Sequence, residues 1–317
     1  MRVTNIMMIN NMKYNVNNNM SRLERLQYET SQGKKFRYPS DDPIGVSRSL
    51  KFYTDIAKGE QHLKNANDAV SWMNTTEAAL NELNAVVLRA HELTVQAANG
   101  PNLEELDKIQ TEIIELKESM IQIANSTYSG RRLFSGFQTD RDLIDKDGNY
   151  NINLEIEDPA KREVFEYNTG VAERVVVNTL GMTVFGTVGA GGVDDPIYDT
   201  NAVKDEKPYL ITLFESMSTN LENRDQGEIQ KDIGRIKNAY DNVLKVTAEF
   251  GARTNRMELT KNKLDDSVFN LKSLMSDNEN VDLAEAFTRL LTEENVYRAS
   301  LGVTGRIIQP SLMDFLR

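Results

Sequence analysis

The chain has 317 residues, no cysteine, two histidines and a formal net charge of −11. This composition excludes disulfides and thiolate metal sites, argues against a nucleic-acid partner and removes the parts that most nucleophilic catalysis needs. Apolar residues make up 39% of the sequence, below the roughly 45–50% of globular domains, which fits an elongated helical protein with little core.

The charge is distributed unevenly along the chain. Residues 1–37 contain seven basic and two acidic side chains, whereas residues 136–207 contain seven basic and fifteen acidic ones. No run of 18 apolar residues is present, so no membrane span is expected. The first residues lack the apolar core of a signal peptide, so any export is expected to use a route without that signal.

Residues 4–31 are expected to form a helix with one apolar stripe. A non-helical connection follows, marked by Gly33 and Pro39. Asp42 before Pro43 is typical of a helix N-cap with proline at the first helical position. The next helix is expected to run from Pro43 to Asn99, and the following one from about 102 to 128. The short turn between them predicts that they are antiparallel.

Residues 229–275 have the most regular pattern in the chain. Apolar residues recur there at alternating spacings of three and four, which is the seam of a coiled coil and predicts at least one long partner helix. Combined with the helix at 102–128, it gives the positions expected in the coiled-coil core: Leu106, Ile109, Ile113, Leu116, Ile229, Ile233, Ile236, Val243, Phe250, Leu264, Val268 and Leu271.

Between these helices the sequence changes character. Half of the eighteen glycines lie between Gly130 and Gly192, and four strand-like runs are predicted in a small β-rich insert. The runs are 150–157, 163–167, 173–178 and 182–188. Gly189–Gly192 is predicted to be a flexible link, and Pro208 is expected to open a short helix.

The C-terminal segment has a second amphipathic stripe, which begins after Asn280. We expect the two chain ends to pack together and then against other copies, because exposed stripes of this size would be an aggregation liability. The residues expected at this subunit interface are Ile9, Met12, Val16, Met20, Leu23, Leu283, Phe287, Leu290, Tyr297, Leu301 and Ile308.

No catalytic, cofactor or metal site is predicted. The loop at 145–151 resembles a calcium loop, but its glycine and its twelfth position do not fit, and a hairpin turn at Asp147-Gly148 is the better interpretation. His62 and His91 are about 43 Å apart if they share one helix, so they cannot bind one metal. Trp72 is interpreted as a packing anchor.

Three segments together resemble a known family. The segment from Ser31 to Gly45, SQGKKFRYPSDDPIG, resembles the N-terminal signature of flagellins and flagellar hook-associated proteins. DLAEAFT at 282–288, YRASL at 297–301 and SLMDFL at 311–316 resemble the C-terminal signature, and GRRLFSG at 130–136 resembles the start of the variable domain. Asp-Asp-Pro at 41–43 is similar to the hook-associated members rather than to flagellins.

The resemblance implies a mainly α chain: an elongated antiparallel coiled-coil bundle, built from both ends of the sequence, with an inserted β-rich domain. The expected parts are an N-terminal assembly helix and connection (1–42), coiled-coil helices (43–135), a variable insert (136–207), further coiled-coil helices (208–279) and a C-terminal assembly helix (280–317).

The resemblance also implies a structural adaptor that is exported by the flagellar type III apparatus and lies outside the cell at the hook–filament junction. Its expected partners are other copies of itself in a ring, the first junction protein, flagellin and an export chaperone. One alternative is a minor flagellin that forms filament. Another is an enzyme carried on residues 138–205, although that insert has no histidine.

Overall fold

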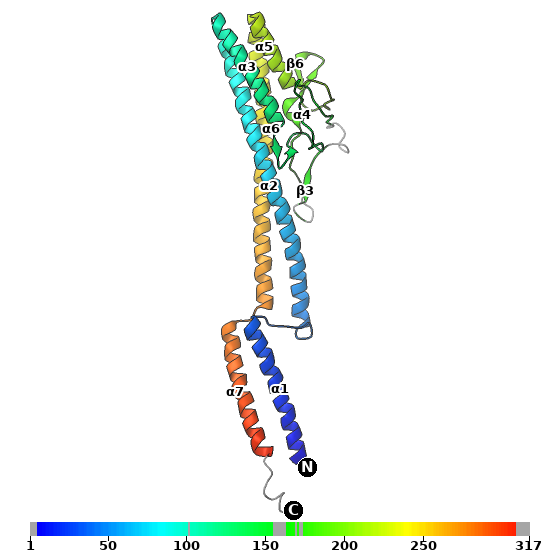
Figure 1. The fold of residues 1–317 in the computed structure, drawn as a ribbon, viewed down its shortest axis with the longest axis vertical. Helices are drawn as coiled ribbons and strands as arrows, with labels where there is room; N and C mark the ends of the chain where they lie inside the picture. Colours follow the sequence, from blue (N-terminus) through cyan, green and yellow to red (C-terminus); the bar gives the residue numbers. More distant parts are fainter. Residues whose placement is uncertain (1–4, 101, 155–162, 169, 171–173, 309–317) are drawn as a thin grey trace, which may run out of the picture. The chain divides into compact units, whose positions relative to one another are not determined.

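The computed structural model describes residues 5–100, 102–154, 163–168, 170 and 174–308, with the side chains of residues 5, 6 and 306–308 left out. The described chain divides into two compact units. We call residues 1–60 and 266–317 the terminal unit, and residues 61–265 the central unit. Two long helices, α2 (Pro43–Ala98) and α6 (Gln226–Glu279), contribute residues to both units (Figure 1).

Four helices form the framework of the central unit: parts of α2 and α6, with α3 (Leu103–Ala124) and α5 (Tyr209–Asn223). The expected helices at 43–99, at 102–128 and after Pro208 are thus present, but the second ends at Ala124, because the chain turns there into the strand at 127–128. Alanines of α2, among them Ala66, Ala69 and Ala90, are fully buried in the core and bring its backbone close to its neighbours. Trp72 packs edge-on against Tyr128 and Phe165, with ring centroids 5.9 and 6.3 Å away. Its role is therefore that of a packing anchor.

Within the described residues, the insert contains one short helix and two two-stranded antiparallel sheets, and a third such sheet lies just before it in the chain. The sheets pair β1 (Thr127–Tyr128) with β2 (Arg131–Arg132), β3 (Glu166–Asn168) with β4 (Arg174–Val176), and β5 (Thr187–Gly189) with β6 (Gly192–Ile197). Its buried side chains belong to the same hydrophobic cluster as those of the four helices. The chain is therefore mainly α with a small β-rich insert, as the sequence predicts.

Two predictions for the insert were wrong. Residues 182–188 are not a strand, because α4 (Gly181–Phe185) occupies most of that run and ends at Gly186, whose φ is +65°. A five-residue helix is too short to display a helical period, so its alternating sequence looked like a strand. Gly189–Gly192 is not a flexible link but the turn between β5 and β6, in which Gly189 pairs with Gly192.

The Asp145 loop forms the predicted hairpin turn. Asp145 Oδ1 accepts hydrogen bonds from the backbone N–H groups of Asp147 and Asn149, at 3.0 and 2.9 Å. Gly148 has a φ of +84°, which favours glycine, and Ile144 pairs with Tyr150 across the turn. The Asp145 carboxylate is thus hydrogen-bonded to the backbone of its own loop. The predicted run at 150–157 is described only to Leu154, and the rest lies outside the described residues.

A buried arginine ties the insert to α6. Arg235, whose side chain is 11% exposed, reaches Asp194 of β6 at 2.6 Å and Asp232 at 2.7 Å. Asp232 is 1% exposed and also accepts a hydrogen bond from Asn220 of α5 at 2.7 Å. Hydrogen bonding to Arg235 holds the pKa of Asp194 below its usual value. One cation therefore fixes β6, α5 and α6 to each other.

In the terminal unit, α1 (Asn5–Gln32) and α7 (Leu283–Ile308) lie side by side, and their adjoining connections pair with each other (Figure 1). Lys34 and Asn280 form an antiparallel bridge. The backbone N–H of Lys35 donates to the carbonyl oxygen of Glu279 at 2.7 Å. Asp42 caps α2 by accepting a hydrogen bond from the Gly45 N–H at 2.9 Å, as its position before Pro43 predicts.

Glu279 is a buried charge of the terminal unit. Its carboxylate is 2.7 Å from Lys34 Nζ and accepts a hydrogen bond from the Tyr53 hydroxyl at 3.2 Å. Burial raises the pKa of Glu279, but hydrogen bonds from Lys34 and Ser49 outweigh it and leave that pKa below its usual value. Further along α6, Val268 packs over Gly59 so closely that a Cβ at Gly59 would lie 2.8 Å from its Cγ2 atom. Glycine therefore lets α2 and α6 approach within this unit.

Replacing Arg235 with methionine should lower the free energy of unfolding of the full chain by about 3 kcal/mol, because Asp232 would become a buried, unpaired charge. Urea denaturation measures this. The double variant Arg235→Met, Asp232→Asn should lose clearly less, since no charge is then stranded. Equal losses in the two variants would show that the ion pair is not the cause.

The Glu279 carboxylate should stabilise the terminal unit in a pH-dependent way. Because its pKa is lowered on folding, its contribution is present above the ordinary value of 4.5 and is lost as the pH falls through the folded pKa. The stability difference between wild type and Glu279→Gln, measured by urea denaturation from pH 7 to pH 3, should therefore shrink towards acid. A difference that stays constant with pH would contradict this assignment.

Candidate subunit interface

The α1–α7 pair has almost no core of its own. Among the described side chains of these two helices, Ala286 is the only apolar one that is buried. Arg22 of α1 and Glu293 of α7 form an ion pair at 3.8 Å, and the arginine side chain is 67% exposed. Water screens such a pair, so it contributes little to the stability of the two-helix pair. Asp282 caps α7 by accepting hydrogen bonds from the N–H groups of Ala284 and Glu285, at 2.8 and 3.3 Å.

The residues predicted for the interface fall into three groups. Half-buried residues, on the sides where the two helices meet, are Ile9, Met12, Val16, Leu23, Leu290 and Tyr297. Exposed residues are Met20, Leu283, Phe287 and Leu301, each with between 46% and 56% of its surface accessible. Ile308 belongs to α7, but its side chain lies outside the described part of the structure. Pairing with the neighbouring helix thus covers only one edge of the α7 stripe.

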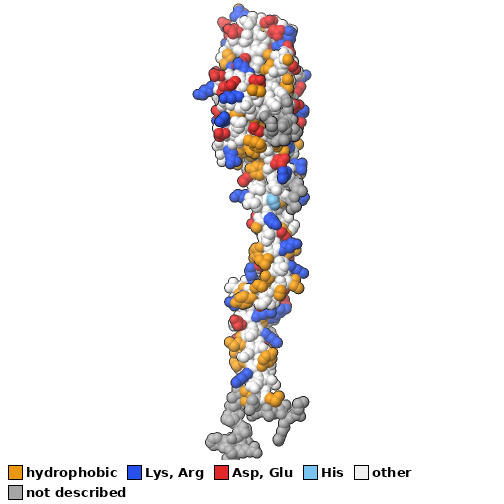
Figure 2. All heavy atoms as spheres, turned by 90° about the vertical axis from the view of Figure 1, so that its right-hand side faces the viewer, with side chains coloured by type: hydrophobic (Ala, Val, Ile, Leu, Met, Phe, Trp, Pro, Cys, Tyr) orange, Lys and Arg blue, Asp and Glu red, His pale blue; other side chains and the backbone are white. Residues whose placement is uncertain are grey.

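Further apolar residues of the pair are exposed although they were not predicted as interface positions. They are Met7, Met8, Tyr14, Leu291, Val296 and Val303, each between 41% and 68% exposed. Leu291 follows Leu283 and Phe287 at intervals of four, so these three form one ridge along α7. The four-residue spacing of this ridge can be read from the sequence, but the side of α7 that α1 covers cannot. Apolar side chains are visible on the surface of this pair in the space-filling view (Figure 2).

An apolar ridge beside a pair without a core can bind other helices. Burying a side chain of the size of leucine or phenylalanine is worth roughly 1.5–3 kcal/mol, so the three-residue ridge alone offers several kcal/mol to a partner. Exposed contiguous apolar surface of this kind marks interaction sites. The pair therefore has the chemistry of a helix-packing interface.

The residues predicted for the coiled-coil core lie inside the helical framework of their units. Eight are buried: Leu106, Ile109, Ile113, Ile229, Ile236, Val243, Phe250 and Val268. Leu116, Ile233, Leu264 and Leu271 are half-buried. None of the twelve is exposed.

The described residues contain no group of three or more His, Cys, Asp or Glu side chains arranged to hold a metal. His62 lies on α2, where its Nδ1 is 3.3 Å from the carbonyl oxygen of Asn168. No helix within the described ranges combines the length and apolarity needed to cross a bilayer.

Comparison with known families gives two matches that together span more than half of the chain. The bacterial flagellin N-terminal helical region matches residues 3–139, and the bacterial flagellin C-terminal helical region matches residues 233–316. The first contains α1, α2 and α3, and the second contains most of α6 and all of α7. Most of the β-rich insert lies between the two matched regions.

Individual relatives match over nearly their whole length. Flagellin of Bacillus subtilis is 27% identical over 300 residues, covering 92% of this chain and 90% of the relative. Flagellar hook-associated protein 3 of Salmonella typhimurium is 24% identical over 310 residues, covering 95% of each. The crystal structure of flagellar hook-associated protein 3 from Legionella pneumophila has a TM-score of 0.58 at 15% identity, covering 72% of this chain and 98% of that one. The chain belongs to the family of bacterial flagellins and flagellar hook-associated proteins.

Proposed function

We propose that this protein is a structural adaptor of the bacterial flagellum, which joins the hook to the flagellin filament by self-assembly of its terminal helices. The observation that carries the proposal is the α1–α7 pair, whose apolar ridge is exposed while only Ala286 among its described apolar side chains is buried. Similarity to hook-associated protein 3 over 95% of both chains supports the junction role.

The partners follow from that role. Other copies of this chain complete the terminal helices in a ring, the first junction protein contacts the ring on the hook side, and flagellin contacts it on the filament side. Before assembly, a flagellar export chaperone covers the exposed ridge of α7. The assembled protein lies outside the cell, at the hook–filament junction, after export through the flagellar type III apparatus.

A minor flagellin is the second candidate, and a specific observation favours it. Flagellin of Bacillus subtilis is 27% identical to this chain over nine-tenths of each protein, so length does not separate the two roles. Against it, Pro43 follows the paired aspartates as in hook-associated members. An enzyme on the insert has less support, because the named relatives are structural flagellar proteins.

Replacing Phe287 and Leu291 together with aspartate should abolish assembly while leaving the monomer folded, because both side chains are more than half exposed. Circular dichroism of the purified chain should be unchanged, and complementation of a deletion strain should fail. Thr292→Asp is the matched control, since it adds a charge to an exposed position on the same helix. Restored motility with the double variant would contradict the proposed interface.

Deleting the gene in its own bacterium should leave cells with hooks but without filaments, as seen by electron microscopy, because the adaptor would be missing between them. Expressing this protein alone in a strain without flagellin should give no long filaments. Filaments of normal length in the deletion strain would overturn the junction role, and filaments built from this protein alone would favour the minor flagellin.

A further inference from the structure

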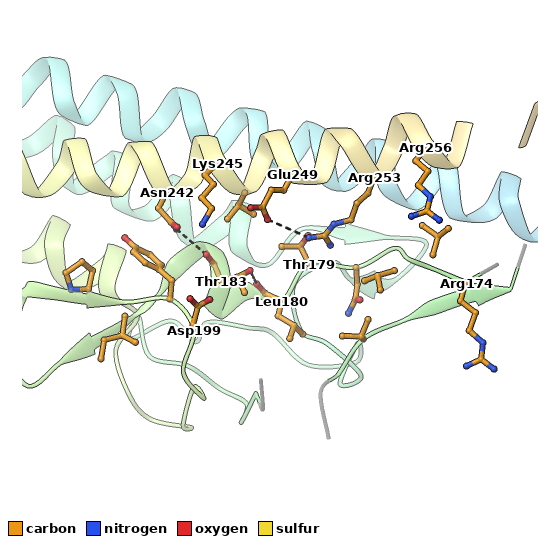
Figure 3. Close-up of a pocket in the computed structure, with 18 residues that line it drawn as sticks. Arg174, Thr179, Leu180, Thr183, Asp199, Asn242, Lys245, Glu249, Arg253 and Arg256 are labelled. Carbon is orange, nitrogen blue, oxygen red and sulfur yellow. Dashed lines mark hydrogen bonds and ion pairs between the residues drawn. The ribbon is translucent and has the colours of Figure 1, made fainter. Parts of the chain in front are cut away.

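Five buried side-chain atoms have no hydrogen-bond partner among the described residues. Four belong to neutral groups of the central unit: Trp72 Nε1, Asn84 Oδ1, Thr179 Oγ1 and the Tyr198 hydroxyl. Thr179 and Tyr198 line the cleft between α6 and the insert, in which Asn242 donates a hydrogen bond to a backbone carbonyl oxygen at 3.2 Å (Figure 3). The fifth atom, Oε2 of Glu293 in α7, belongs to a carboxylate. Burying an unpaired carboxylate costs more free energy than burying a neutral group, so Glu293 is the least favourable of the five.

Glu293 lies on the line along which α7 meets α1. The α7 side chains on that line, each buried or half-buried, follow one another at spacings of four and three: Ala286, Leu290, Glu293, Tyr297, Ser300 and Thr304. The line on α1 has the same kind of spacing and consists of half-buried residues: Ile9, Met12, Val16, Asn19, Leu23, Leu26 and Thr30. This spacing is that of a coiled-coil seam, and we call the two lines together the terminal seam.

The α7 side of the terminal seam is half polar. Its polar positions are Glu293, Ser300 and Thr304, and Asn19 adds an amide on the α1 side. The hydroxyls of Ser300 and Thr304 donate to the carbonyl oxygens of Tyr297 and Ser300, each at 2.7 Å, and so form bonds within α7 rather than to α1. The terminal seam therefore supplies little apolar contact to hold the two helices together.

Glu293 has no good partner across the terminal seam. Its Oε1 atom is 3.8 Å from Arg22 of α1, which is beyond hydrogen-bonding distance. Its Oε2 atom is buried and unpaired. A buried carboxylate without hydrogen bonds opposes the packing of the helices that enclose it, and replacing buried ionic groups with apolar side chains is often stabilising. Glu293 therefore weakens the α1–α7 pair near the middle of α7.

We propose that Glu293 keeps α1 and α7 of a single copy from closing into a finished pair, so that both helices remain free to repack against neighbouring copies. The proposal rests on the self-assembly proposed above and names the residue that limits pairing within one copy. A polar residue at a seam position lowers stability and selects among packing partners. A neighbouring copy displaces the pairing within one copy only if it binds these helices better, and weak pairing lowers that requirement.

The full-length variant Glu293→Leu tests this role, because leucine would make the seam apolar from Leu290 to Tyr297. In the purified monomer, the amide hydrogens of α1 and α7 should exchange about tenfold more slowly than in wild type, as measured by mass spectrometry, since the pair would open less often. Thr292→Leu is the matched control. It adds the same side chain at an exposed position of α7 outside the terminal seam, and it should leave the exchange unchanged.

The same variants then test assembly in cells that lack the native gene. Glu293→Leu should give about tenfold fewer filaments per cell than wild type, counted by electron microscopy, whereas Thr292→Leu should restore the normal number. Export of the Glu293→Leu chain, followed in the culture medium, should equal that of wild type. Unchanged exchange, impaired export or a normal number of filaments in Glu293→Leu would overturn this role and leave the proposed function intact. Failure of the proposed function would instead appear as filaments that form without this protein.

Discussion

The apolar seam of α6 is the interaction on which the rest of this structure depends. In the central unit its side chains, Ile236, Val243 and Phe250 among them, are fully buried against the other helices. In the terminal unit the same helix packs Val268 over Gly59 of α2. Burial of a regular seam is what makes so long a helix stable, since propensity alone contributes little.

The packing of the helices around this seam also limits the structure that the insert can form. The two small sheets of the insert, and the third just before it, have only two strands each in the described structure, and isolated two-stranded sheets are marginal in water. They persist because their buried residues join the core of the helices and because Arg235 fixes β6 to α6. The insert is therefore part of the helical core rather than an independent barrel or sandwich.

The terminal unit differs from the central unit in which of its side chains are buried. Its charged joint at Glu279 is buried and fully paired, whereas its two terminal helices have nearly no buried apolar side chains. This joint holds the end of α1 and the start of α7 without completing the packing between the two helices. The remaining apolar surface of these helices is available for contact with other helices.

The sequence alone was enough to predict the long helices, most of their ends and the family, because the regular apolar seam at 229–275, a proline after an N-cap and signatures at both ends are local signals. It also determined that Asp145 belongs to a hairpin turn. Only the tertiary structure decided that residues 181–185 are helical and that Gly189–Gly192 is a hairpin turn, since both depend on a core supplied by distant helices. It likewise decided which edge of the α7 stripe α1 covers. A periodic pattern identifies an apolar face, but the partner that covers it comes from elsewhere in the chain or from another copy.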